Sequence, residues 1–152
     1  RKQPVAEILR EHWAKFGRNY YSRHDFEAIA TDKADDMFAT LRGSLGNLPG
    51  KVVEGMTVSA ADDFAYTDPV DASVSQKQGV RVLFSDGSRI VYRLSGTGTE
   101  GATLRVYLER YAPGPDGLDL DAQEALAPVI RAAHALANIA GHTGRTAPDV
   151  VT

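Results

Sequence analysis

The most informative segment of the chain is Arg93-Leu94-Ser95-Gly96-Thr97-Gly98-Thr99-Glu100-Gly101-Ala102-Thr103-Leu104-Arg105, which has a β-type apolar run on each side. Residues 89–94 form the run before the glycines, and residues 104–111 form the run after them. Between the runs, glycines and hydroxyl-bearing residues leave little side-chain bulk. This pattern predicts two strands joined by a glycine-rich turn.

The chemistry of this turn favours an anion. Glycines allow close approach to the backbone, and successive N–H groups in such turns form a concavity for negative charge. Arg93 and Arg105 flank the segment, and a guanidinium group binds two phosphate oxygens at once. The segment therefore predicts a phosphate-binding loop. The alternative is a long hairpin loop without a ligand. A nucleotide-binding loop is not indicated, because the segment lacks G-x-x-x-x-G-K-[ST] and its glycines do not open a helix.

Composition bounds the class of protein. The chain has 152 residues, 43% hydrophobic and 24% charged, with a formal net charge of −3, which is typical of one soluble globular domain. The acidic balance argues against a general nucleic-acid or anionic-membrane surface. Absence of cysteine excludes disulfides and thiolate metal sites. No apolar run approaches the ~20 residues of a membrane span, and no signal-peptide core follows the first residues, so we expect a cytoplasmic setting.

Three helices are predicted from apolar spacing. Residues 4–16 form an amphipathic helix with one buried face that ends at Gly17, and His12 and Trp13 are assigned to core packing. A second helix is expected over residues 25–45. A third runs from about residue 121 to residue 140, with Asp121 as its cap and Gly141 after its end.

Strand patterns alternate with these helices. Residues 18–22 predict a short strand, followed by a charged cluster, Arg23-His24-Asp25, interpreted as a solvated turn with a place near a phosphosugar cleft as the alternative. Further strands are expected within 51–64, 80–84, 89–94 and 104–111, with a two-residue Asp86-Gly87 turn in the clearest hairpin. The order predicts an α+β domain, an antiparallel sheet with helices packed on one face.

Four carboxylates fall within ten residues of one another, and nothing in their spacing makes them converge on a metal. They are Asp62, Asp63, Asp68 and Asp71.

The 93–105 segment closely resembles the phosphate-binding loop in the C-terminal domain of phosphoglucomutase, in the α-D-phosphohexomutase superfamily. Its long Gly-Thr-Gly-Thr-Glu-Gly form is more similar to phosphoglucomutases than to phosphomannomutases. The resemblance covers nearly the whole chain, since residues 16–26, 68–73, 85–92 and 143–152 also look like segments of that family in the same order. It implies a TBP-like β-α-β4-α fold, with residues 1–152 as domain IV of a larger enzyme, and a docked C-terminal tail.

The resemblance also implies a function. Phosphoglucomutases are isomerases that interconvert glucose 1-phosphate and glucose 6-phosphate, with a phosphorylated serine, a magnesium ion in an Asp-Gly-Asp-x-Asp loop and a sugar-reading loop in three upstream domains. Neither a Ser-His-Asn nor an Asp-Gly-Asp motif occurs in this chain. The resemblance thus implies Mg²⁺ and glucose 1,6-bisphosphate for the full enzyme, no cofactor for this chain, and no activity of the fragment alone.

Family roles carried onto matching positions assign the grip on the substrate phosphate to one set of residues. Thr99 stands where serine is common, Glu100 departs from the pattern and is left out, and Ala72 replaces a usual glycine. No catalytic or metal-binding residue is expected in the chain. The phosphate-binding set is Arg93, Ser95, Gly96, Thr97 and Arg105.

Three other functions remain open. The chain could belong to a phosphomannomutase-type enzyme, because a phosphate carries no sugar information. It could be a non-catalytic phosphosugar-binding relative. Likeness of fold also suggests a nucleic-acid module, but fold alone implies no DNA binding, and the net charge counts against it.

Overall fold

A computed structural model of the chain describes residues 3–98 and 101–152. The helices are α1 (Val5–Phe16), α2 (Thr31–Ser44), a 3-10 turn η1 (Leu45–Asn47), α3 (Ala122–Ala137) and α4 (Ile139–Thr143). The strands are β1 (Arg18–Ile29), β2 (Val52–Val53), β3 (Met56–Thr67), β4 (Val74–Phe84), β5 (Arg89–Gly98), β6 (Gly101–Ala112) and β7 (Val150–Val151).

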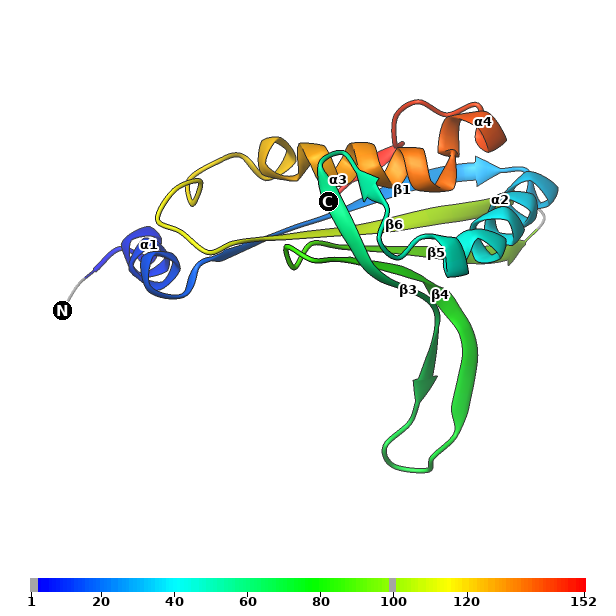
Figure 1. The fold of residues 1–152 in the computed structure, drawn as a ribbon, viewed down its shortest axis with the longest axis horizontal. Coiled ribbons are helices and arrows are strands. Elements are labelled where there is room, and N and C mark those ends of the chain that lie inside the picture. The colour runs from blue at the N-terminus through cyan, green and yellow to red at the C-terminus, as the bar shows by residue number, and fades with distance from the viewer. Residues whose placement is uncertain (1–2, 99–100) are drawn as a thin grey trace.

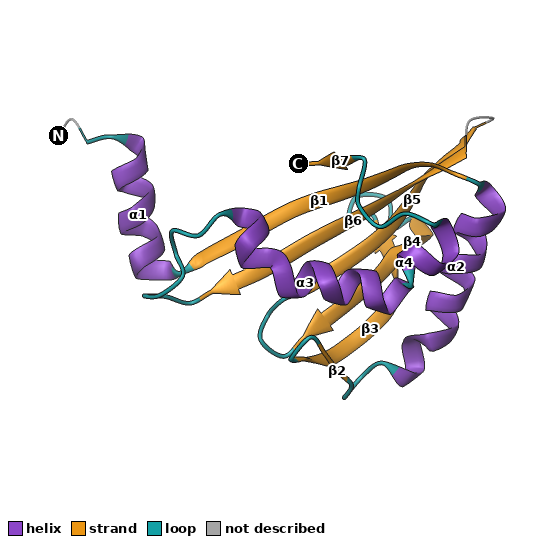
Figure 2. Ribbon diagram, turned by 90° about the horizontal axis from the view of Figure 1, so that it is seen from above, coloured by secondary structure: helices purple, strands orange, loops and turns teal. Residues whose placement is uncertain are grey.

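The strands form one antiparallel sheet in the order β2-β3-β4-β5-β6-β1-β7. Figure 2 shows that α2, α3 and α4 lie across one face of this sheet. Strand β6 shows why one face is covered. Leu104, Val106 and Leu108 are buried, whereas the residues between them are only half-buried, because successive side chains of a strand point to opposite faces. The predicted α+β class, with its β-α-β4-α order and helices on one face, is confirmed (Figure 1).

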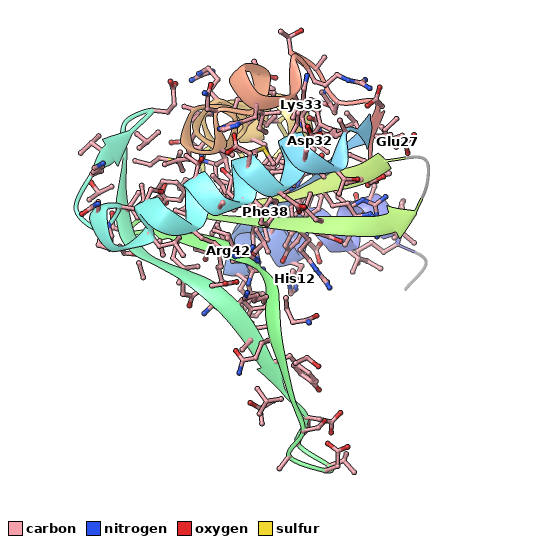
Figure 3. All side chains as sticks on the ribbon, turned by 90° about the vertical axis from the view of Figure 1, so that its right-hand side faces the viewer. His12, Glu27, Asp32, Lys33, Phe38 and Arg42 are labelled. Carbon is pink, nitrogen blue, oxygen red and sulfur yellow. The ribbon has the colours of Figure 1, made fainter. Side chains whose placement is uncertain are left out.

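Helices contribute the second layer of the core. Met37, Phe38 and Leu41 of α2 are buried, as are Leu126 and Val129 of α3. Figure 3 looks toward α2 and shows Phe38 and Arg42 on the side of this helix nearer the sheet. Arg42 reaches β3, where its Nε donates to Asp63 at 2.9 Å. The apolar periodicity of both helices therefore matches the face that they bury.

Helix α1 departs from the prediction. None of its residues is buried, and Val5 remains 72% exposed, because the helix lies beyond the end of the sheet, away from the helical layer (Figures 1 and 2). Trp13 is half-buried because the Arg18 guanidinium lies 4.1 Å from its ring centroid. The expected buried face, and the assignment of His12 and Trp13 to the core, were wrong for this chain.

Strand β1 is longer than predicted. Arg23-His24-Asp25 is not a solvated turn but the middle of this strand, paired with β6 on one edge and with β7 on the other. His24 and Asp25 are both buried. The second helix consequently begins at Thr31 rather than at residue 25. Local sequence underestimated β1 because its polar residues find their partners about 100 residues away: His24 Nε2 meets Gln123 Oε1 at 2.9 Å.

Helix and hairpin ends differ in detail. Asp121 caps α3 as predicted, since its carboxylate accepts from the backbone of Gln123 and Glu124. The helix ends earlier than expected, at Ala137, because Asn138 adopts a left-handed conformation with φ of 43°. The β4–β5 hairpin is confirmed, but four residues, 85–88, lie between the two strands, and Phe84 N donates to Ser88 O at 2.9 Å.

The C-terminal tail is docked, as the family resemblance implied. Strand β7 pairs with β1, and the Thr152 amide donates to Arg23 O at 3.0 Å. Asp149 holds the approach to β7, because its carboxylate accepts from Glu27 N at 2.8 Å and from Arg145 Nη1 at 2.8 Å. The tail thereby covers an edge of β1 that would otherwise expose unpaired backbone groups.

Acid is expected to release this tail. The hydrogen bond from Glu27 N, followed by the attraction of Arg145, lowers the pKa of Asp149. Its contribution to stability is therefore present above the unfolded pKa, about 3.9, and is lost as pH falls through the lower folded pKa. NMR signals of residues 150–152 should move toward unfolded positions below about pH 4. Asp149→Asn should weaken docking at neutral pH and flatten the pH profile. Identical profiles in the two proteins would contradict this.

Beyond the Phe64–Gly79 pair, the β3–β4 hairpin leaves the sheet as an arm (Figure 1). Asp62 pairs with Arg81, and Asp63 pairs with Arg42. Asp68 and Asp71 bind the tip instead, accepting from the backbone of Val70 and Ser73, respectively. The four carboxylates singled out in the sequence thus have separate structural roles.

Ala72 at the tip of this arm has a φ of 59°, so the exchange from the usual glycine matters more than its small size suggested. A left-handed alanine costs roughly 1–2 kcal/mol, and glycine returns part of that in unfolded-state entropy. Ala72→Gly should therefore raise the free energy of unfolding by about 0.5–1 kcal/mol in urea titrations. A loss of stability would show that Ala72 makes a contact worth more than its strain.

Candidate phosphate-binding site

Strands β5 and β6 bring the two flanking arginines together. Arg93 and Arg105 are direct partners in the antiparallel ladder, and they lie on the face that no helix covers, opposite the partly buried Leu94 and the buried Leu104 of the same strands. The strands extend further than predicted, since Ser95 pairs with Thr103 and Gly98 with Gly101. The glycine-rich segment is therefore mostly strand, and residues 99 and 100 connect its two sides.

The structure describes the side chains of some predicted site residues but not of others. Arg93 is exposed, Ser95 is half-buried, and the Arg105 side chain is 41% exposed. Gly96 and Thr97 continue the backbone of β5, and the side chain of Thr97 lies outside the described residues. Thr99 and Glu100 also lie outside them. Of the proposed set, the structure brings together Arg93 and Arg105, with Ser95 two residues farther along the same strand face.

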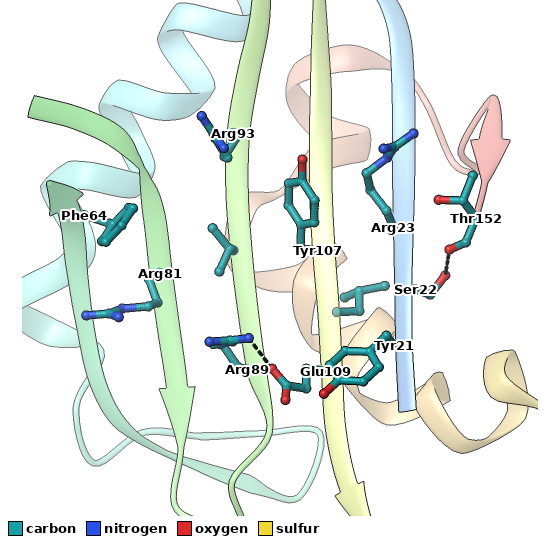
Figure 4. Close-up of a pocket in the computed structure, with 12 residues that line it drawn as sticks. Tyr21, Ser22, Arg23, Phe64, Arg81, Arg89, Arg93, Tyr107, Glu109 and Thr152 are labelled. Atoms are coloured by element: carbon teal, nitrogen blue, oxygen red, sulfur yellow. Dashed lines mark hydrogen bonds and ion pairs between the residues drawn. The ribbon is translucent and has the colours of Figure 1, made fainter. Parts of the chain in front are cut away.

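Strand β1 adds an arginine that the prediction left out. Arg23 pairs with Tyr107, and Asp25 pairs with Arg105. Both therefore lie on the uncovered face beside the Arg93–Arg105 pair. Figure 4 shows the side chains of Arg93, Tyr107 and Arg23 from three neighbouring strands. The period of two along β1 would have placed Arg23 and Asp25 on one face, had the segment been recognised as strand.

This face is hollowed. A cavity of about 590 Å³ lies over the sheet, lined by Tyr21, Arg23, Phe64, Val91, Arg93 and Tyr107, among others. Such a volume is in the range of small-molecule sites. Arg81 and Arg89 line it as well, but each has an acidic partner of its own. Arg81 binds Asp62 at 2.6 Å, and this hydrogen bond raises the pKa of Arg81. Arg89 is paired with Glu109 (Figure 4).

Two of the three remaining arginines, Arg23 and Arg105, share one carboxylate, that of Asp25. Arg23 Nε lies 2.8 Å from Asp25 Oδ1, and Arg105 Nε lies 3.9 Å from Asp25 Oδ2. Arg93 Nη2 contacts Gln78 Oε1, a neutral group, at 3.4 Å. Three positive charges and one negative charge leave this cluster at +2. We name Arg23, Arg93, Arg105 and Asp25 the arginine cluster.

Two glycines keep the cluster in place. A Cβ on Gly79 would lie 2.6 Å from Tyr92 O and 2.9 Å from Arg93 Cγ, so β4 passes directly under the Arg93 stem. A Cβ on Gly101, whose φ is 94°, would lie 2.7 Å from Ile29 O. All three distances are shorter than van der Waals contact, and a side chain at either glycine would displace a strand that carries the cluster.

The described residues offer no group of side chains for the magnesium ion that the family resemblance implies for full enzymes. Within residues 3–98 and 101–152, no three His, Asp or Glu side chains gather to hold a metal ion. The sequence also lacks the Asp-Gly-Asp motif.

The described helices include none of the length and apolarity that a membrane crossing requires.

Comparison with known proteins identifies the domain. A family model described as the C-terminal domain of phosphoglucomutase-1 matches residues 18–149. Phosphoglucomutase from Rhizobium radiobacter is 53% identical over all 152 residues, which are 28% of its length. The chloroplastic phosphoglucomutase 1 of Marchantia polymorpha is 49% identical over 97% of this chain and 23% of its own. The chain thus spans about a quarter of the length of these relatives.

Solved structures agree with this comparison. The open form of the Paramecium exocytosis-sensitive phosphoprotein pp63/parafusin, a phosphoglucomutase by its description, superposes with a TM-score of 0.84. It is 41% identical and is matched over 97% of this chain and 25% of its own. The chain belongs to the family of phosphoglucomutase C-terminal domains.

Proposed function

We propose that residues 1–152 are a single domain, corresponding to domain IV of a phosphohexomutase, that binds the non-reacting phosphate of a sugar phosphate. The observation that carries this proposal is the placement of Arg93 and Arg105 as ladder partners on one uncovered face, with Arg23 beside them. The proposed phosphate ligands are Arg93, Ser95, Gly96, Thr97 and Arg105, with Arg23 added.

A phosphate group held in this way serves as a handle. Its binding energy fixes the sugar relative to reacting groups held elsewhere, so that remote contacts contribute to positioning. The +2 charge of the arginine cluster is complementary to a phosphate ester, which carries about −1.5 to −2 at pH 7. The proposed whole protein interconverts glucose 1-phosphate and glucose 6-phosphate, with Mg²⁺ and glucose 1,6-bisphosphate serving parts outside these 152 residues.

Two alternative functions would use the same phosphate-binding site. A phosphomannomutase-type parent would use the same handle, and assays with both hexose phosphates decide between them. A non-catalytic relative would lack the serine and metal motifs upstream. The names of the relatives favour phosphoglucomutase, and because they include both chloroplastic and cytoplasmic forms, the cytoplasmic location is part of this proposal and does not follow from them. The chain alone should show no turnover, and turnover by it would overturn the assignment of catalysis to other domains.

The direct test is an NMR titration of this chain with inorganic phosphate, glucose 1-phosphate and glucose. The NMR signals of the backbone amides of residues 93–105 and of the Arg23 side chain should shift with both phosphates and not with glucose, because the site binds only the phosphate group. Binding should be weak, since a few charge-assisted hydrogen bonds must offset the cost of association. Equal responses to glucose and to phosphate, or no response to millimolar phosphate, would refute the proposed site.

A further inference from the structure

Asp25 is an unusual neighbour for a phosphate site. Its side chain is only 6% exposed, and its two oxygens face two different arginines of the cluster. Oδ1 accepts from Arg23 Nε at 2.8 Å, and Oδ2 lies 3.9 Å from Arg105 Nε. Arg105 Nε is itself buried and has no hydrogen-bond partner within the described residues. The carboxylate thus lies between the edges of two guanidinium groups.

Each arginine faces Asp25 with its Nε side, and this determines which of its hydrogen-bond donors remain available to a ligand. Both contacts involve Nε, so the Nη groups at the far end of each guanidinium are left for another ligand. Among the residues described, neither Arg23 nor Arg105 has a hydrogen bond from an Nη group. A free pair of Nη groups matches two oxygens of a phosphate. An acid placed at the Nη end would compete with phosphate for the same donors.

The backbone fixes Asp25 from both sides. Its strand pairs with β6 at Arg105 and with β7 at Val150, and its own carbonyl accepts from Asp149 N at 2.8 Å. Burying a carboxylate is costly unless charged partners compensate it. Removing the arginines would therefore leave Asp25 uncompensated, and removing Asp25 would leave two arginine stems without an orienting contact.

We propose that Asp25 is a positioning residue that orients Arg23 and Arg105 by their Nε edges and so presents their Nη groups to a phosphate dianion. This inference rests on the proposed phosphate-binding function. The charge of the cluster supports the dianion, because Asp25 reduces the +3 of the arginines to the +2 that a doubly charged phosphate neutralises. Asp25 itself repels the ligand, so its only favourable effect on binding is through geometry.

The test is Asp25→Asn, with affinity for inorganic phosphate measured by NMR titration of this chain. Electrostatics alone predicts tighter binding, because the variant removes a negative charge near the anion. Positioning predicts weaker binding, by about tenfold, the effect of one charge-assisted hydrogen bond. Asp119→Asn is the matched control, since it removes the same charge beside Arg10, neither of which lines the cavity, and should change affinity less than twofold. Equal or tighter binding by Asp25→Asn would overturn the proposal.

A second measurement covers a variant that fails to fold. In the wild-type chain, the Nε–H protons of Arg23 and Arg105 should exchange with water much more slowly than that of Arg93, whose Nε does not face Asp25. Fast exchange at Arg23 or Arg105 would show that the carboxylate does not hold them. If the wild-type chain does not bind phosphate at all, the proposed function itself fails, whatever Asp25 does.

Discussion

Replacing Arg105 by alanine is expected to weaken the binding of inorganic phosphate about 10- to 100-fold. The variant removes charge-assisted hydrogen bonds of roughly 1.5–3 kcal/mol, and each 1.4 kcal/mol corresponds to about a tenfold change in affinity. It also halves the net charge of the arginine cluster, from +2 to +1. Stability should change little, because the side chain is 41% exposed and the closer partner of the buried Asp25, Arg23 at 2.8 Å, is retained. Affinity is measured by NMR titration and stability by urea unfolding.

Arg131→Ala is the matched control for this experiment. It makes the same change of residue and charge on α3, where Arg131 pairs with Glu54 and is 57% exposed. Because it lies on the helical side of the sheet, its effect on phosphate affinity should stay within about twofold, given screening over distances beyond the Debye length. In the proposed full-length phosphoglucomutase, Arg105→Ala should lower kcat/KM, while Arg131→Ala should not. Equal effects of the two variants would remove Arg105 from the site.

Much of the sheet could be predicted because its strands carry local signals. Apolar alternation identified residues 89–94 and 104–111, and the Asp86-Gly87 pair identified the hairpin between β4 and β5. Once these strands pair in register, Arg93 and Arg105 must meet on one face. The core of the candidate site was therefore accessible from sequence, with the family resemblance supplying the ligand.

Strand β1 shows why the rest was not accessible. Along this strand both faces carry polar residues, so the period of two is hidden. Ser22 and His24 point to the covered face and remain satisfied there, because Gln123 donates to Ser22 at 2.8 Å and meets His24 at 2.9 Å. Both contacts come from Gln123 of α3, about 100 residues away, so no local sequence pattern predicts them. For the same reason Arg23-His24-Asp25 was interpreted as a turn, with a place near a phosphosugar cleft only as the alternative, and Arg23 was left out of the binding set.

Helix α1 failed in the opposite way. Its apolar spacing predicted a helix correctly, but spacing alone cannot say what a face packs against. The sheet has seven strands, and its covered face is already filled by α2, α3 and α4. Four large apolar side chains of this helix therefore remain exposed, namely Val5, Ile8, Leu9 and Phe16. An amphipathic pattern thus specifies the helix, while the partner has to come from the tertiary structure.

Leu104→Ala should cause a large loss of stability, although it changes the residue next to Arg105. Leu104 is fully buried and is the ladder partner of Leu94 on one side and of Phe26 on the other. Truncating a buried leucine removes its transfer free energy and leaves a cavity, which costs about 2–5 kcal/mol. We expect the urea midpoint to fall accordingly with an unchanged m-value.

Leu120→Ala is the matched control for Leu104→Ala, because Leu120 is 41% exposed and its truncation should cost less than about 1 kcal/mol. The folded fraction of Leu104→Ala should still bind phosphate, whereas Arg105→Ala should stay folded and bind poorly. Leu104 and Arg105 are adjacent but lie on opposite faces of β6, so the first would then determine stability and the second phosphate binding. Equal losses of stability in Leu104→Ala and Leu120→Ala would mean that β6 does not carry the core, and the register that brings Arg93 to Arg105 would fail with it.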